Sequence, residues 1–321
     1  MNNYSWMQQK LHQFALSSEF MRQAAFDIES LTIKSIQHND NHVFISGIAR
    51  SGTTILLNAI YKSNEFASLS YKDMPFVLAP NLWSKLSLFK KDLDLIERAH
   101  GDGIEVSKES PEAFEEVFWM TFHDSRNSIN EMFRTYVSLI NHKYQKYRYL
   151  SKNNQNIKRI EVISRIFPNS KILIPFREPL QQAYSLLYQH KRFINNSNQN
   201  KFISNYMKWI GHTEFGPNYI PMNQNGINYK DDLNINHWIE QWYLSYKSSM
   251  DSFKDKKNIH FICYEKLCES NEYWLNTLKI LDIKEKYSFP FKTSIKEISL
   301  DYDYELNDKA SLIYSELSKY T

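Results

Sequence analysis

Residues 43–61 read V-F-I-S-G-I-A-R-S-G-T-T-I-L-L-N-A-I-Y, and this segment is the most informative part of the chain. The apolar run at 43–45 predicts a buried strand, and residues 55–60 predict a helix. Between them lies a loop with glycines at Gly47 and Gly52. Such a loop builds an anion cradle, because the unpaired N–H groups of the helix's first turn and the helix dipole both favour a phosphate-like group. The stretch therefore predicts an α/β protein with an anion-binding loop.

The glycine spacing is similar to the nucleotide-binding P-loop, G-x-x-x-x-G-K-[S/T], but position 53 is threonine where the P-loop has lysine. That lysine reaches the β- and γ-phosphates, and the next hydroxyl binds Mg²⁺. Its absence argues against a site for a nucleoside triphosphate with Mg²⁺. Arg50, inside the loop, supplies the cation instead, and a guanidinium can hold phosphate or sulfate oxygens bidentately. The alternative is an ordinary strand-to-helix turn with a surface arginine.

Composition narrows the class of protein. The chain has 321 residues with 39 basic and 36 acidic side chains, so its charge does not call for a nucleic-acid partner. Its two cysteines, Cys263 and Cys268, are too few for a disulfide framework or an all-cysteine zinc site, and they favour a reducing, cytoplasmic location. We see no signal peptide at the N-terminus and no run of about 20 apolar residues that could span a membrane.

Strand and helix patterns alternate along the whole chain. Further strands are predicted at 66–71, 147–150, 171–176 and 259–263, with helices at 5–36, 53–63, 81–99, 128–144, 157–166, 180–190 and 237–253 and one beginning at Ser110. This alternation predicts a P-loop-like three-layer α/β fold, in which helices flank a central parallel sheet of about five strands. We expect one domain over residues 1–321, with an irregular lid inserted at about 194–236.

Arg177 and Ser185 form a second anion-binding candidate. The arginine ends the strand 171–176, and the serine follows eight residues later in the next helix. The two side chains can donate three hydrogen bonds to one phosphate. Alternatively, Arg177 pairs with Glu178 and Ser185 faces the helix. One ligand with two separated anionic groups would explain both this pair and the Arg50 loop.

At this point the chain resembles the sulfotransferases that use 3′-phosphoadenosine 5′-phosphosulfate (PAPS), in particular bacterial and carbohydrate-type members. In that family a P-[K/R]-S-G-T-T loop binds the 5′-phosphosulfate, and a later R-x₇-S element binds the 3′-phosphate. Residues 49–54 resemble the first element, and residues 177–185 resemble the second. Residues 152–172 resemble the approach to the arginine, and 264–267 resemble the Y-E-D-L turn. Ala49 replaces the usual proline, and no R-K-G element is present.

The resemblance spans about residues 40–270 and implies an enzyme that moves a sulfuryl group from PAPS to an acceptor hydroxyl without a metal. The released product would be 3′-phosphoadenosine 5′-phosphate (PAP). The acceptor would be a carbohydrate or a small molecule. Arg50 and the N–H groups of 51–54 would stabilise the shifting charge. The implied cofactor-binding residues are Arg50, Ser51, Gly52, Thr53, Thr54, Arg177 and Ser185.

A base must accept the proton of the acceptor hydroxyl. Asp73 is the first candidate, because it follows the second strand and would lie near the Arg50 loop if the two strands are neighbours. Carboxylates with a pKa of about 4 are poor bases unless burial raises that value. His100 is the second candidate, although a histidine before a glycine can also simply end a helix. Glu109 and Glu112 are lesser candidates, and Asp73 can equally be a turn residue.

Three further residues are candidates for substrate binding. Lys152, after the third strand, could bind the phosphosulfate or the acceptor, or it could be a solvated lysine. His212 and Glu214 lie in the aromatic-rich segment 209–216 of the lid. Such a segment suits stacking on sugar rings, but it could equally pack the loop down as a small separate cluster.

Two other functions stay open at this stage. One is a P-loop-type kinase or phosphotransferase, which the threonine at position 53 disfavours. The other is a nucleotide-binding protein without catalytic activity. A zinc site is not expected, because the ten histidines form no H-E-x-x-H pattern. The acceptor, the adenine contacts and the oligomeric state cannot be read from the sequence.

Overall fold

The computed structural model describes residues 5–32, 39–87, 110–124, 128–197 and 201–321. Its centre is a five-stranded parallel sheet in the order β2-β3-β1-β4-β5. The strands are β1 (Val43–Ile45), β2 (Phe66–Ala67), β3 (Arg148–Lys152), β4 (Lys171–Phe176) and β5 (Ile259–Cys263). The α/β fold with a parallel sheet of five strands, predicted from the alternation of patterns, is confirmed.

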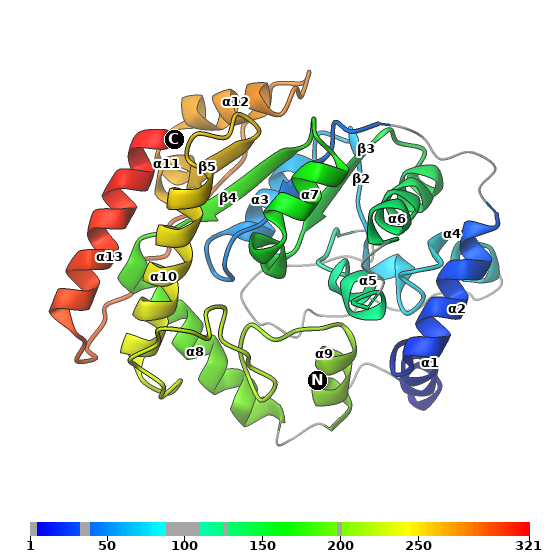
Figure 1. Cartoon of the computed structure of the whole chain (residues 1–321), viewed down its shortest axis with the longest axis horizontal. Helices are drawn as coiled ribbons and strands as arrows, with labels where there is room; N and C mark the ends of the chain where they lie inside the picture. The colour runs from blue at the N-terminus through cyan, green and yellow to red at the C-terminus, as the bar shows by residue number, and fades with distance from the viewer. Residues whose placement is uncertain (1–4, 33–38, 88–109, 125–127, 198–200) are drawn as a thin grey trace.

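Helices surround the sheet (Figure 1). In the first half they are α1 (Trp6–Leu16), α2 (Glu19–Ser30), α3 (Thr53–Tyr61), α4 (Pro80–Ser87), α5 (Glu116–Thr121), α6 (Ile129–Tyr144) and α7 (Ile160–Ile166). In the second half they are α8 (Pro179–Ser197), α9 (Lys201–Trp209), α10 (Ile235–Phe253), α11 (Tyr264–Glu269), α12 (Asn271–Ile280) and α13 (Tyr304–Leu317). Short 3₁₀ turns occur at η1 (Tyr71–Asp73), η2 (Asn154–Lys158) and η3 (Ser318–Tyr320). In Figure 1, α1 and α2 lie at the opposite end of the long axis from α13.

The sheet is buried on both faces, as parallel sheets require. Alternate residues of β1 enter different cores: Phe44 packs with side chains of α5, α6 and α7, whereas Val43 and Ile45 pack with α3 and α12. All three are fully buried. This period of two explains why an unbroken apolar run forms the strand, and it produces the three-layer architecture.

Two elements depart from the sequence prediction around residue 70. The strand expected at 66–71 ends at Ala67, and the helix expected at Ser110 does not form there. Instead, Pro111 pairs with Ser70 in an isolated antiparallel bridge, and the N–H of Glu112 donates to the carbonyl of Leu69 at 3.0 Å. This long-range pairing engages backbone groups at 111–112 that the predicted helix would have needed for its own hydrogen bonds. Helix α5 therefore begins only at Glu116.

The lid expected at 194–236 is only partly irregular. Helix α8 continues to Ser197, and α9 fills 201–209, so among the described residues of this segment the irregular stretch is 210–234. Helix α9 buries Tyr206 and Met207, and the Tyr206 ring lies 5.8 Å from that of His12 on α1. Packing against α1 therefore stabilises a helix that the Asn-rich sequence concealed. The predicted helix 81–99 is confirmed as α4 up to Ser87, and its remainder lies outside the described residues.

Candidate functional site

The loop between β1 and α3 has the conformation that its glycine predicts. Gly52 adopts φ +89°, and a Cβ there would lie 2.3 Å from Cδ2 of Tyr264, so only glycine fits. Arg50 also has a left-handed φ of 69°, which is uncommon for a residue with a side chain. Ser51 is buried, and its hydroxyl donates to the carbonyl of Ile48 at 2.7 Å. The loop is therefore held in one shape by its own hydrogen bonds, and it packs against Tyr264.

Helix α8 packs directly against this loop. Arg50 Nε donates to Ser185 Oγ at 3.0 Å, and Gln182 Nε2 donates to the carbonyl of Ala49 at 3.0 Å. The two candidate anion elements, 135 residues apart in sequence, therefore meet in space. The alternative of an isolated surface arginine does not describe this loop.

Arg177 is held at the end of β4. Its carbonyl accepts from Trp242 Nε1 at 3.1 Å, and its guanidinium donates to the carbonyl of Ser294 and lies 5.9 Å from the centre of the Tyr264 ring. The alternative pairing with Glu178 is wrong. The Glu178 carboxylate instead accepts the N–H groups of Leu180 and Gln181 at 3.2 and 2.7 Å and caps α8.

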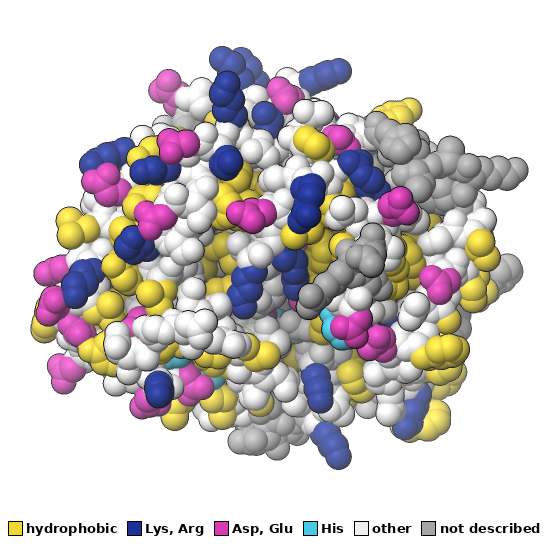
Figure 2. All heavy atoms as spheres, in the orientation of Figure 1, with side chains coloured by type: hydrophobic (Ala, Val, Ile, Leu, Met, Phe, Trp, Pro, Cys, Tyr) yellow, Lys and Arg dark blue, Asp and Glu magenta, His cyan; other side chains and the backbone are white. Residues whose placement is uncertain are grey.

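These elements enclose a cavity of about 700 Å³. It is lined by Arg50, Gly52, Thr53, Thr54, Ile55, Arg177, Gln181, Tyr184, Ser185, Tyr188, Gln189, Arg192, Tyr264, Lys292, Thr293, Ser294 and Lys296. Five of these side chains are cationic and none is acidic. Figure 2 shows Lys and Arg side chains in a hollow near the middle of the face. Such a cavity suits a ligand with more than one anionic group.

Two parts of this cavity escaped the sequence analysis. One is the stripe that surrounds the predicted Ser185 on α8, at positions 181, 184, 188, 189 and 192, whose helical spacing is present in the sequence. The other is the segment 292–296, which pairs with α8 through Gln181 and Lys296: their side chain and backbone exchange hydrogen bonds of 2.8 and 2.9 Å. No local pattern marks that segment, because its partner lies 115 residues away.

Asp73 is not beside the Arg50 loop. Strand β3 lies between β1 and β2, so the condition on which that placement depended is not met. The Asp73 side chain is completely buried and pairs with Lys143. Its carboxylate also accepts the Tyr144 hydroxyl at 2.6 Å and the Ser70 N–H at 2.7 Å. Asp73 therefore closes the turn after β2 and does not line the cavity.

Lys152, His212 and Glu214 form a second polar cluster, at the end of β3. Lys152 pairs in register with Ile45, the last residue of β1, and is 8% exposed. His212 Nδ1 lies 3.6 Å from Glu214 Oε2, and the same carboxylate accepts Asn154 Nδ2 at 3.2 Å. Burial lowers the pKa of His212; the Glu214 charge opposes this shift and the Lys152 charge adds to it. The three predicted substrate-binding residues thus act on one another.

Aromatic rings fix this cluster against α8. The ring of Phe193 is nearly parallel to that of His212, with centroids 5.6 Å apart, and Phe215 meets His212 edge-on at 4.6 Å. Glu112, a lesser candidate, accepts the Tyr71 hydroxyl at 2.9 Å, and its charge also reaches His212. His100 and Glu109 lie outside the described residues.

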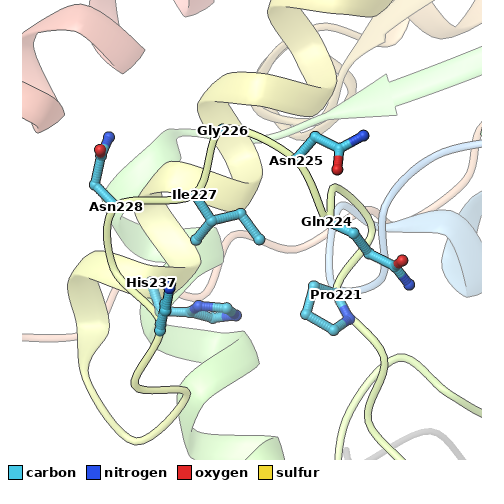
Figure 3. A pocket seen from close by; sticks show the side chains of 8 residues that line it. Pro221, Gln224, Asn225, Gly226, Ile227, Asn228 and His237 are labelled. Carbon is cyan, nitrogen blue, oxygen red and sulfur yellow. The ribbon is translucent and has the colours of Figure 1, made fainter.

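A second cavity, of about 570 Å³, lies between the loop 221–230 and α10 (Figure 3). Its described walls are mainly amide and apolar side chains, together with Lys230 and His237. Both ring nitrogens of His237 are engaged, at 2.6 Å from the Tyr219 hydroxyl and 2.7 Å from the Tyr229 carbonyl. This cavity lacks the paired cations of the first.

In the described part of the chain, no group of three or more His, Cys, Asp or Glu side chains is arranged to hold a metal ion. None of the helices described is both long and apolar enough to cross a membrane.

Comparison with known proteins adds the family. A sequence model of the sulfotransferase family matches residues 42–215. Among solved structures, a sulfotransferase from Mycobacterium avium is similar with a TM-score of 0.46 and 10% identity, covering 98% of this chain and 79% of its own. A sulfotransferase from Mycobacterium tuberculosis gives 0.46 and 11%, with 96% and 81% covered. One from Alicyclobacillus acidocaldarius gives 0.40 and 12%, with 87% and 93% covered. No curated protein matches.

Proposed function

The chain belongs to the sulfotransferase family, and on that premise we propose that it moves a sulfuryl group from PAPS to an acceptor hydroxyl. The observation that carries this proposal is the cavity, whose described lining residues include five cationic and no acidic side chains. PAPS has two anionic groups at opposite ends of its ribose. The cavity offers arginines on two separate elements, the loop after β1 and the end of β4.

We assign the 5′-phosphosulfate to Arg50, Ser51, Gly52, Thr53 and Thr54. This loop precedes α3, whose first N–H groups and dipole favour an anion, and the Thr53 and Thr54 side chains can add hydroxyl donors. We assign the 3′-phosphate to Arg177 and Ser185, with Lys292 and Lys296 beside them. These two lysines stand near the C-terminus, where the R-K-G element of other members is missing.

The bound donor supplies an activated sulfuryl group, and the protein supplies orientation and charge. The guanidinium of Arg50 and the N–H groups of the loop stabilise the negative charge that develops on the leaving phosphate. Because these hydrogen-bond donors are held in place before PAPS binds, little reorganisation of the protein accompanies sulfuryl transfer. A metal ion has no necessary role in this scheme, since cationic side chains do the same electrostatic work.

We place the acceptor at the cluster of Lys152, His212 and Glu214, one strand away from the loop. Its mixture of a cation, a carboxylate, an imidazole and aromatic rings suits a hydroxyl-rich ligand such as a carbohydrate. Asp73 is left out of the catalytic assignment, because its carboxylate is enclosed and engaged by Lys143 and Tyr144. His100 stays a candidate for the base.

Calorimetric titration with PAP, without metal, tests the proposal. We expect the wild type to bind and Arg177→Ala to lose about 1.5–3 kcal/mol of binding free energy, the usual scale for charge-assisted hydrogen bonds. Arg165→Ala, which removes an exposed arginine on α7, is the matched control and should bind like the wild type. Binding of ATP with Mg²⁺ but not of PAP would instead support the kinase alternative.

A further inference from the structure

Tyr264 lines the cavity and lies against both elements that carry its two arginine subsites. It follows β5 directly and is 5% exposed. Its ring occupies the space in which a Cβ of Gly52 would lie, 2.3 Å from Cδ2. The Arg177 guanidinium lies over the same ring, 5.9 Å from its centre. One rigid ring is therefore in contact with the loop that carries Arg50 and lies beneath the guanidinium of Arg177.

The surroundings of the ring restrict its movement. The Tyr264 hydroxyl donates to the carbonyl of Lys292 at 2.9 Å, which ties the segment 292–296 to the same side chain. The next residue, Glu265, lies 3.9 Å from Arg177 Nε and accepts the N–H of Glu178 at 3.1 Å. Burial raises the pKa of the Tyr264 phenol, so the hydroxyl keeps its proton and remains a donor near neutral pH. The turn after β5 thus contacts the Arg177 side chain through both Tyr264 and Glu265.

We propose that Tyr264 is a specificity-determining residue: its ring sets the separation of the Arg50 and Arg177 subsites, so that the cavity selects nucleotides carrying an anionic group at both the 5′ and the 3′ position. The assignment of those groups rests on the proposed function. With a smaller side chain at position 264, each arginine would stay in the cavity, but the distance between the two guanidinium groups would no longer be fixed. Two-point binding depends on that distance, because preorganised groups lose less conformational entropy when the ligand binds. One-point binding at the Arg50 loop does not depend on it.

The test compares two nucleotides that differ only in the 3′-phosphate, PAP and adenosine 5′-phosphate. The measured quantity is the ratio of their dissociation constants for the full-length chain by calorimetry. Tyr264→Leu should bring the preference for PAP down by about tenfold, with adenosine 5′-phosphate affinity changed by about twofold or less. Tyr264→Phe keeps the ring and loses only the bond to Lys292, so it should retain the wild-type ratio within about twofold.

Tyr273→Leu is the matched control. Its hydroxyl accepts the N–H of Cys263 at 3.2 Å, so the substitution disturbs the same strand end, but Tyr273 does not line the cavity. It should lower the melting temperature and leave the ratio unchanged.

An unchanged ratio in Tyr264→Leu, or an equal fall in both affinities, would overturn the proposal, since the second result is what a merely structural tyrosine would give. If the leucine variant does not fold, a lost preference in the soluble phenylalanine variant would overturn it as well. Failure of the wild type to bind PAP would overturn the proposed function and this inference with it, and is therefore distinguishable from failure of the inference alone.

Discussion

At the carboxyl ends of β1, β4 and β5, cationic side chains line a cavity whose described walls contain no acidic residue, whereas at the end of β2 the charges are enclosed and paired within the protein. Arg50 and Arg177 face the cavity, and Asp73 and Lys143 face one another. One edge of the sheet thus has two halves. The cavity half, at the ends of β1, β4 and β5, leaves its charges available to a ligand, and the enclosed half, at the end of β2, pairs its charges with one another. A charged residue at a strand end therefore indicates function only when the protein leaves room for a ligand beside it.

The enclosed half should show its importance in stability. Breaking the buried Asp73–Lys143 pair with Asp73→Asn should lower the free energy of unfolding by about 3 kcal/mol, because it leaves a cation without its partner. Urea unfolding measures this, and Lys143→Gln, alone and combined, completes a double-mutant cycle. PAP affinity of the folded variants should not change. Normal stability with abolished sulfuryl transfer would instead return Asp73 to the role of base.

The cavity half should show the reverse behaviour. Arg50→Gln should cost about 1.5–3 kcal/mol of PAP binding, since it removes a charged donor from the 5′ subsite. Its free energy of unfolding should change by no more than about 0.5 kcal/mol. Calorimetry and urea unfolding on the same preparation separate the two effects. If Arg50→Gln bound PAP normally but had a lower free energy of unfolding, Arg50 would be a structural residue and the contrast between the two halves would be wrong.

His42, at the amino ends of the strands, is another titratable side chain that is enclosed within the protein. It is 1% exposed, and its Nδ1 accepts the N–H of Tyr149 at 3.0 Å, so the ring must stay neutral there. Burial lowers the pKa of His42 to about 3. Between about pH 6.5 and that value the unfolded chain binds a proton that the folded chain does not, so stability falls as the pH falls, by up to about 1.4 kcal/mol per pH unit.

Urea unfolding at a series of pH values below 7 measures this slope. His42→Gln keeps a side-chain acceptor for Tyr149 but does not titrate, and it should give a shallower dependence than the wild type. Equal slopes for the two proteins would mean that other buried histidines account for the acid sensitivity.

The smallest effect is expected at the rim of the cavity. Lys292 and Lys296 line it but are exposed to solvent. Alanine at either position should weaken PAP binding by about 0.3–1 kcal/mol at low ionic strength. The loss should shrink further at 1 M salt, where the Debye length is about 3 Å. A larger loss that salt does not reduce would show that these lysines contact a phosphate directly.

Local patterns predicted much of the fold. Strands 171–176 and 259–263 have the predicted boundaries, because each is an apolar run closed by a polar turn. The strand predicted at 66–71 was too long and the helix at Ser110 was wrong, because Leu69 and Ser70 pair with the backbone at 111–112 instead. Helix α9 was not predicted, because its neighbours in sequence are rich in Asn and its contact with α1 is a tertiary feature.

The sequence alone indicated the strand, loop and helix at 43–61, the glycines of that loop, and the basic residues that could meet an anion. These follow from side-chain periodicity and backbone conformation, which are local properties. The tertiary structure alone decided that β3 separates β1 from β2, that Asp73 pairs inward with Lys143, and that residues 292–296 complete the cavity. The physical reason is distance along the chain: Arg177 meets Ser294 across 117 residues, and no local pattern encodes such a contact.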